Sequence, residues 1–181
     1  MKKGLSLLVV FLCLMVANLS FGQSTSATTT LKVVLSEAFN ISVSNATAGT
    51  ITFSTIANYT AASGLTATVN DHLSVSSNRS FSITAKITSI TGVDEGANRL
   101  AASNVKILAS DGTTSNGSVY NAEQTFAGVN TGVTIINNAA GTIVGSTNTQ
   151  KKFNVKYTVF DVGDKDLGDY DVNLEYTVAA P

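Results

Sequence analysis

The last stretch of the chain alternates apolar and polar side chains over nine residues. Because successive side chains of a β-strand point to opposite faces, a period of two predicts a half-buried strand. Its apolar positions are Tyr170, Val172, Leu174, Tyr176 and Val178. The polar positions expected to face water are Asp169, Asp171, Asn173, Glu175 and Thr177. We expect this strand to pair with residues 153–160 across the acidic turn between them.

The composition favours an all-β protein. Threonine, valine, serine, asparagine and glycine dominate, Pro181 is the one proline, and charged residues make up 13% of the chain, about half the usual share. Further alternating runs recur along the chain, separated by turn residues; they lie near 39–43, 51–53, 65–75, 81–87, 105–109, 133–136, 142–144 and 153–159. This spacing predicts one two-sheet antiparallel sandwich of about 8–10 short strands over residues 37–181.

The links between these runs predict local connections. Asn78-Arg79 is a short polar link that indicates a hairpin between the runs on either side of it. Asn137 to Gly141 indicates a second hairpin turn. Residues 113–132 have few apolar side chains, so we expect a long surface excursion with a short helix around 121–126.

The first 22 residues are typical of an export signal. Lys2 and Lys3 precede an apolar run from Leu5 to Val16, and Ser20-Phe21-Gly22 places small residues before a cut ahead of Gln23. We therefore expect an extracytoplasmic protein, in the periplasm, at the cell surface or secreted. The mature chain would have no transmembrane segment, and a further boundary at residue 36 would separate an N-terminal extension, 23–36, from the sandwich.

Removal of the signal would leave few chemical possibilities. It takes away Cys13, the only cysteine, and leaves 9 basic against 12 acidic residues, a net charge of about −3. The mature chain then has neither a thiol nor a basic patch for nucleic acid. We identify no catalytic motif or cofactor motif, so the expectation is a protein that is not an enzyme.

Two groups of polar residues are candidates for a catalytic or a metal site. His72, the only histidine, follows Asp71, but adjacent strand residues point to opposite faces, so we expect a histidine at a strand end or in a turn rather than a catalytic pair. The one dense group of carboxylates is a weak calcium candidate, because its spacing does not match a calcium loop and Lys165 interrupts it. Its members are Asp161, Asp164, Asp166 and Asp169.

Glycan binding is the second function to consider. It usually needs exposed aromatic rings, but strand parity turns Phe53, Phe81, Phe153 and Tyr157 inward, and tryptophan is absent. Tyr59 and Tyr120, in the predicted loops 54–63 and 112–132, remain as candidates for contact with an extracellular glycan.

The N-terminal extension also has the pattern of a strand. Leu31, Val33 and Leu35 alternate with other residues, and Glu37 then falls where an inward charge would be costly, so we expect a bend at 36–38. The three apolar side chains could pair within their own domain or fill a groove in another protein. If they do bind between molecules, we expect the C-terminal strand to form one wall of that groove.

These two ends resemble a known group of proteins. Leu31-Lys32-Val33-Val34-Leu35 and Phe39-Asn40-Ile41-Ser42-Val43, with the closing Gly168-Asp169-Tyr170 strand, resemble chaperone/usher fibre subunits and the spore coat protein U type of secreted domain. The resemblance implies an incomplete immunoglobulin-like sandwich in which the N-terminal extension of each subunit fills a groove in the next. We therefore expect a structural or adhesive, pilin-like surface protein with identical or other fibre subunits as partners; a monomeric glycan-binding module is the alternative.

Overall fold

The computed structural model describes residues 30–44, 49–92, 98–114, 117–144 and 147–181. It divides the chain into residues 1–35 and a sandwich from Ser36 to Pro181. The predicted export signal and Cys13 lie outside the described residues. No helix within the described ranges is long and apolar enough to cross a membrane.

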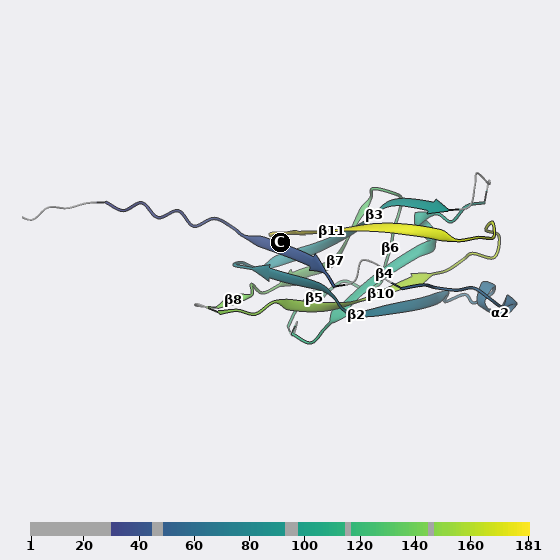
Figure 1. Cartoon of the computed structure of the whole chain (residues 1–181), viewed down its shortest axis with the longest axis horizontal. Coiled ribbons are helices and arrows are strands. Elements are labelled where there is room, and N and C mark those ends of the chain that lie inside the picture. The colour runs from purple at the N-terminus through teal and green to yellow at the C-terminus, as the bar shows by residue number, and fades with distance from the viewer. Residues whose placement is uncertain (1–29, 45–48, 93–97, 115–116, 145–146) are drawn as a thin grey trace, which may run out of the picture. The chain divides into compact units, whose positions relative to one another are not determined.

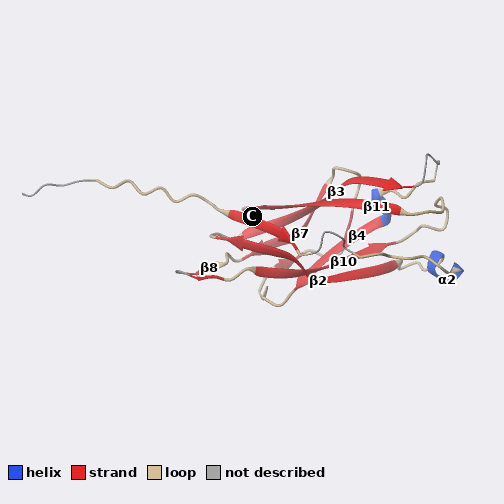
Figure 2. Cartoon of the chain, in the orientation of Figure 1, coloured by secondary structure: helices blue, strands red, loops and turns tan. Residues whose placement is uncertain are grey.

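Two antiparallel sheets form the sandwich, as predicted (Figures 1 and 2). The five-stranded sheet has the order β1 (Phe39–Val43), β2 (Leu65–Ser77), β10 (Lys151–Val159), β4 (Val105–Asp111) and β6 (Gln124–Thr125). The four-stranded sheet has the order β11 (Tyr170–Ala179), β3 (Phe81–Gly92), β7 (Gly132–Ala139) and β5 (Val119–Tyr120). A separate ladder joins β8 (Ile143–Val144) to β9 (Thr147–Asn148). The described residues thus contain more strands than predicted, because two-residue strands leave little signal in a sequence.

The core lies where the inward faces of the two sheets meet. Alternate residues of β2, β3, β4 and β10 are buried, including Phe81 and Phe153, whose rings pack edge to face with centroids 6.2 Å apart. The predicted inward direction of the aromatic residues is confirmed, since Phe81, Phe153 and Tyr157 are buried and Phe53 is half-buried. Alternation therefore identified the core face of each long strand.

Two predicted strand pairings are wrong. β11 does not pair with β10 across the acidic turn; it pairs with β3, from Tyr170 opposite Gly92 to Ala179 opposite Ser82. Residues 78–80 do not close a hairpin either, because they lead from β2 in one sheet to β3 in the other. Alternation shows which side chains face the core, but an inward face can belong to either sheet.

The middle of the chain also differs from the prediction. Residues 121–126 form no helix and instead lead from β5 to β6, and the Asn137–Gly141 segment begins inside β7, which pairs with β3 and β5. A short helix, α2 (Ile56–Tyr59), occurs in the loop predicted at 54–63. Thr55 caps this helix. Its hydroxyl accepts a hydrogen bond from the backbone amide of Asn58, and the side-chain oxygen of Asn58 accepts one from the backbone amide of Thr55.

Substitution of Phe126 tests the packing of this middle segment. The ring is 0% exposed beside β4, where the Phe126 amide donates to the Val105 carbonyl over 3.2 Å. Phe126→Ala should reduce the free energy of unfolding by about 3–5 kcal/mol, because it leaves a cavity in the core. Val119→Ala, at a side chain that is 53% exposed, is the control and should cost less than about 1 kcal/mol. Urea unfolding followed by tyrosine fluorescence measures both; equal effects would contradict the described burial.

Candidate functional site

The two long sides of the sandwich are closed to different extents. On one side, residues 120–126 cross between the sheets and bury Phe126. On the other side, β1 pairs only with residues 73–77 of β2, so residues 65–70 of β2 have no strand partner on that edge in the described chain. β11 is an edge strand of the second sheet on this same side, because it contacts β1. Two unpaired strand edges therefore face each other beyond the end of β1.

A groove of about 760 Å³ lies at this open half. One wall is the first half of β11, Tyr170 to Leu174, and the other is the segment from Gly49 to Phe53, which belongs to neither sheet. Figure 1 shows α2 and the turn from β10 to β11 at this end of the sandwich. The remaining lining residues are Tyr59, Ala67, Leu100, Val105, Tyr157, Val159, Val162, Lys165, Asp166, Leu167, Gly168 and Asp169.

The groove exposes part of the apolar core. Val105, Tyr157 and Val162 are buried in its floor, whereas Val172 and Leu174 on the β11 wall are only half-buried. All five apolar positions of the predicted terminal strand are half-buried, and the polar positions between them are exposed, as the alternation predicted. The first half of β11 lines the groove, whereas filling of this groove by Leu31, Val33 and Leu35 stays a prediction.

A bulge in β2 marks the boundary between the covered and open halves. Val69 pairs with Val155 and Leu73 with Phe153, so three residues of β2 oppose Asn154 alone. Asp71 has a positive φ of 50°, and its amide donates to the Asn154 side chain over 2.8 Å. The extra residues turn His72 into the core and leave Asp71 facing Thr113, so these neighbours do not form a catalytic pair.

His72 is a buried titratable group between two tyrosines. Its ring is 2% exposed, and its centroid lies 6.0 Å from that of Tyr157 and 5.9 Å from that of Tyr176, both edge to face. The Nδ1 atom has no hydrogen-bond partner among the described residues. Burial lowers the pKa of His72, because the charged imidazolium would lose its hydration there.

The two tyrosines bond to each other through their hydroxyl groups. Burial raises the pKa of Tyr157 to about 12, and it raises the pKa of Tyr176 as well. Both therefore stay neutral over the physiological range. The cluster links β10 in one sheet to β11 in the other directly behind the groove.

The four aspartates proposed for calcium are spread along an exposed turn. Asp164 pairs with Lys165 over 3.1 Å, and Asp166 accepts a hydrogen bond from the Asn98 amide over 3.3 Å. Asp161 and Asp169 are exposed. Within the described ranges, no three histidine, cysteine or acidic side chains are close enough to hold a metal ion.

The candidate glycan-binding tyrosines both pack on phenylalanine rings. The ring centroid of Tyr59 lies 5.5 Å from that of Phe53 at the groove. The ring centroid of Tyr120 lies 6.3 Å from that of Phe153, and the Tyr120 hydroxyl donates a hydrogen bond to the Asp111 carboxylate over 2.5 Å. Tyr120 does not line the groove. Of these two tyrosines, Tyr59 alone lines the groove.

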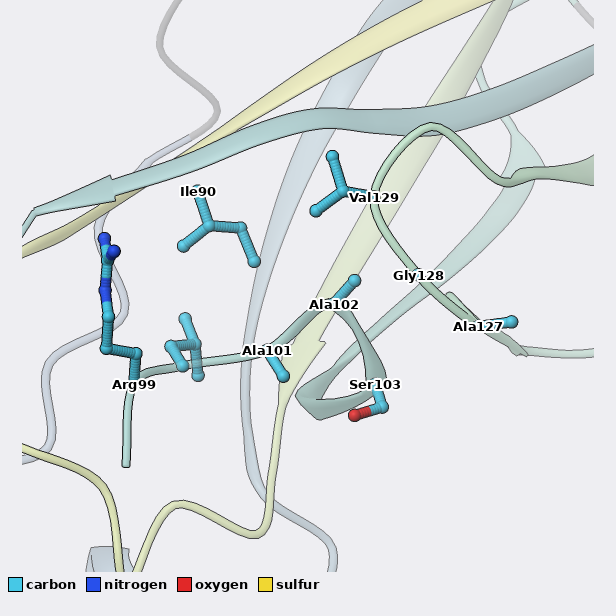
Figure 3. A pocket seen from close by; sticks show the side chains of 9 residues that line it. Ile90, Arg99, Ala101, Ala102, Ser103, Ala127, Gly128 and Val129 are labelled. Carbon is cyan, nitrogen blue, oxygen red and sulfur yellow. The ribbon is translucent and has the colours of Figure 1, made fainter. Parts of the chain in front are cut away.

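A second, smaller depression of about 340 Å³ lies near the end of β3 (Figure 3). Small and apolar side chains dominate its lining, and Arg99 is its one charged group. The Arg99 guanidinium donates to the Gly92 carbonyl over 3.1 Å. The lining residues are Ile90, Arg99, Leu100, Ala101, Ala102, Ser103, Ala127, Gly128 and Val129. Sequence reasoning singled out neither this depression nor the Gly49–Phe53 wall.

Comparison with family models, curated proteins and solved structures found no match for the chain. The geometry of the groove and the pattern of the N-terminal extension are therefore the basis for any functional proposal.

The buried histidine predicts a dependence of stability on pH. His72 has its ordinary pKa of about 6.5 when the chain unfolds and a lower pKa when folded. Below pH 6.5 the unfolded state binds a proton that the folded state does not, so the free energy of unfolding should fall as the pH falls, by at most about 1.4 kcal/mol per pH unit. Urea midpoints between pH 7.5 and 5.5 measure this loss.

His72→Phe is the control for this pH series. It keeps an aromatic ring in the core and removes the only histidine, so its urea midpoint should change much less over the same range. An equal loss of stability in the variant and the parent chain would contradict the assignment to His72.

Proposed function

We propose that this protein is an extracytoplasmic structural or adhesive subunit of a surface fibre. Copies assemble when Leu31, Val33 and Leu35 of one copy fill the β11 groove of the next. The observation that carries the proposal is the groove itself, a sandwich left open along one edge in a chain that also has an alternating apolar segment outside the sandwich. The protein is not an enzyme in this proposal, and its partners are identical subunits or other fibre proteins.

The N-terminal segment has apolar surface to bury. Residues 30–35 belong to no strand, and the exposed fractions of Leu31, Val33 and Leu35 are 83%, 67% and 91%. Full burial of a leucine or valine side chain stabilises a structure by about 1.5–3 kcal/mol. Burial of all three against the apolar side chains of the groove, such as Val172 and Leu174, would therefore contribute several kcal/mol.

The backbone of β11 supports the same mode of binding. Its outer edge has no strand partner in the described chain, so its amide and carbonyl groups on that side can bond to an added strand. Added main-chain hydrogen bonds provide affinity, and side chains of alternate residues provide specificity. An extended Leu31–Leu35 segment supplies both.

The point where the extension leaves the sandwich favours a second copy as the acceptor. The Asn78 side chain donates to the Ser36 carbonyl and accepts from the Ala38 amide, both over 2.9 Å. This fixes Ser36 beside the turn between β2 and β3, at the Ala179 end of β11. The groove begins at Leu174, about 17 Å along β11 from Ala179. Leu35 is only one residue, about 3.8 Å, from Ser36, so it does not reach the groove of its own copy.

The resemblance of the two chain ends to chaperone/usher fibre subunits agrees with this proposal. In those proteins the N-terminal extension of one subunit fills a groove in the next. The predicted bend at 36–38 fits the same division, because Glu37 pairs with Arg79 at the surface instead of pointing into the core.

A pair of matched substitutions tests the proposal in the chain that starts at Gln23. Val33→Thr places a hydroxyl in the groove and should weaken assembly about 5- to 30-fold, since burial of an unpaired hydroxyl costs about 1–2 kcal/mol. Val34→Thr makes the same chemical change on the opposite face of the segment and should have little effect. Sedimentation velocity over a concentration series measures the apparent dissociation constant of the assembly.

Deletion of residues 23–35 is the stronger version of this test. The remaining chain should stay monomeric and should bind a synthetic peptide of residues 23–35. A parent chain that remains monomeric at every concentration would contradict the proposal.

Glycan binding by the monomer is the second candidate, because Tyr59 and Tyr170 line the groove together with Lys165 and Asp166. Saturable binding of an oligosaccharide by a monomeric parent chain, with loss of binding in Tyr59→Ala, would favour that function over assembly.

A further inference from the structure

The outer face of β11 carries a row of acidic side chains beside the groove. Asp171 and Glu175 of β11 and Asp169, directly before it, are all exposed, and Asp169 and Asp171 also border the groove. Glu175 pairs with Lys86 of β3 over 3.1 Å, whereas Asp171 lies opposite the uncharged Thr91. Among the described residues, neither Asp169 nor Asp171 forms an ion pair. The part of β11 that borders the groove therefore presents negative charge that the sandwich does not neutralise.

The donated segment carries one charge of the opposite sign. Lys32 is the only charged residue between Gln23 and Leu35. In an extended segment, alternate side chains point to opposite faces. If Leu31 and Val33 point into the groove, Lys32 between them points away from it, to the same outer face as Asp171. Side chains directly opposite each other on neighbouring strands are about 4.5–5.5 Å apart at Cβ, and diagonal neighbours about 7–8 Å.

The lengths of the two segments match. The part of β11 that lines the groove, Tyr170 to Leu174, has five residues, as does Leu31 to Leu35, and each spans about 14 Å from its first to its last Cα atom when extended. If the two strands run parallel, Lys32 lies opposite Asp171. If they run antiparallel, Lys32 lies opposite Asn173 with Asp171 on its diagonal. A lysine side chain reaches the Asp171 carboxylate in both cases.

We propose that Lys32 of one copy pairs with Asp171 of the next and so helps to fix which segment enters the groove and in which register. This inference rests on the proposed function and adds the partner, a second copy of this chain, and a specificity contact on the outer face. The neighbouring Asp169 carboxylate strengthens the same local field. A segment slipped by one residue would turn Lys32 toward the buried Val105 and Tyr157 and would turn Leu31 and Val33 out to water, so it loses apolar burial.

Charge exchange in the chain from Gln23 tests this contact. Lys32→Glu and Asp171→Lys should each raise the apparent dissociation constant of the assembly about three- to tenfold, because each replaces an attraction by a repulsion. The double variant Lys32→Glu with Asp171→Lys should return close to the parent value, since the donated glutamate of one copy then meets the lysine of the next. The parent should weaken toward the single variants in 1 M NaCl.

The matched control is Asp164→Lys, which makes the same change in net charge at an exposed position of the turn before β11. It should leave the dissociation constant nearly unchanged. Single variants that assemble like the parent, or a double variant that is as weak as the singles, would overturn the Lys32–Asp171 contact. If Val33→Thr still weakens assembly in that case, the groove proposal stands without this contact. A parent chain that never assembles would overturn both.

Discussion

β11 presents an apolar face to the core, but among the described residues it has a strand partner on one edge only. Its pairing with β3 runs along the whole strand, so its position in the sheet is secure. Cover from the opposite sheet is incomplete, because β1 reaches only to Leu73 of β2. The half-buried Val172 and Leu174, the groove and the unpaired backbone edge all follow from this one gap. The same gap places the carboxylate of Asp171 beside an accessible strand edge.

The bulge at 70–72 lies at the point where that cover ends. The Ser44 amide donates to the His72 carbonyl over 2.8 Å, which is the last contact of the β1 end with β2 in the described chain. Beyond it the two extra residues bend β2 and bring His72 against Tyr157 and Tyr176. The bulge therefore connects the end of the β1 pairing with the aromatic cluster behind the groove. Between these two neutral aromatic rings, the imidazole of His72 is stable only in its neutral form, because the charged form would lose its hydration.

The opposite side of the sandwich shows how the same chain closes an edge. The short strands β5 and β6 belong to different sheets, and the crossing between them carries Phe126 into the core. Glu123 on the same crossing accepts a bond from the Thr158 hydroxyl over 2.9 Å and pairs with Lys156 over 3.0 Å. These bonds lower the pKa of Glu123 and attach the crossing to β10. No equivalent crossing is present on the β11 side within the described residues, and the groove lies on that side.

The amino-acid sequence by itself determined the all-β class, the inward face of each long strand and the exposed row from Asp169 to Thr177, because these follow from a period of two along the backbone. It also indicated Leu31, Val33 and Leu35 as one apolar face and β11 as a wall. Only the tertiary structure decided that β11 pairs with β3, that residues 78–80 cross between sheets and that β1 stops halfway along β2. Strand pairing is a contact between residues far apart in the chain, and alternation is the same whichever partner a strand has. The groove exists because of those pairings, so its second wall at Gly49–Phe53 and its position beyond β1 could not be predicted from the sequence.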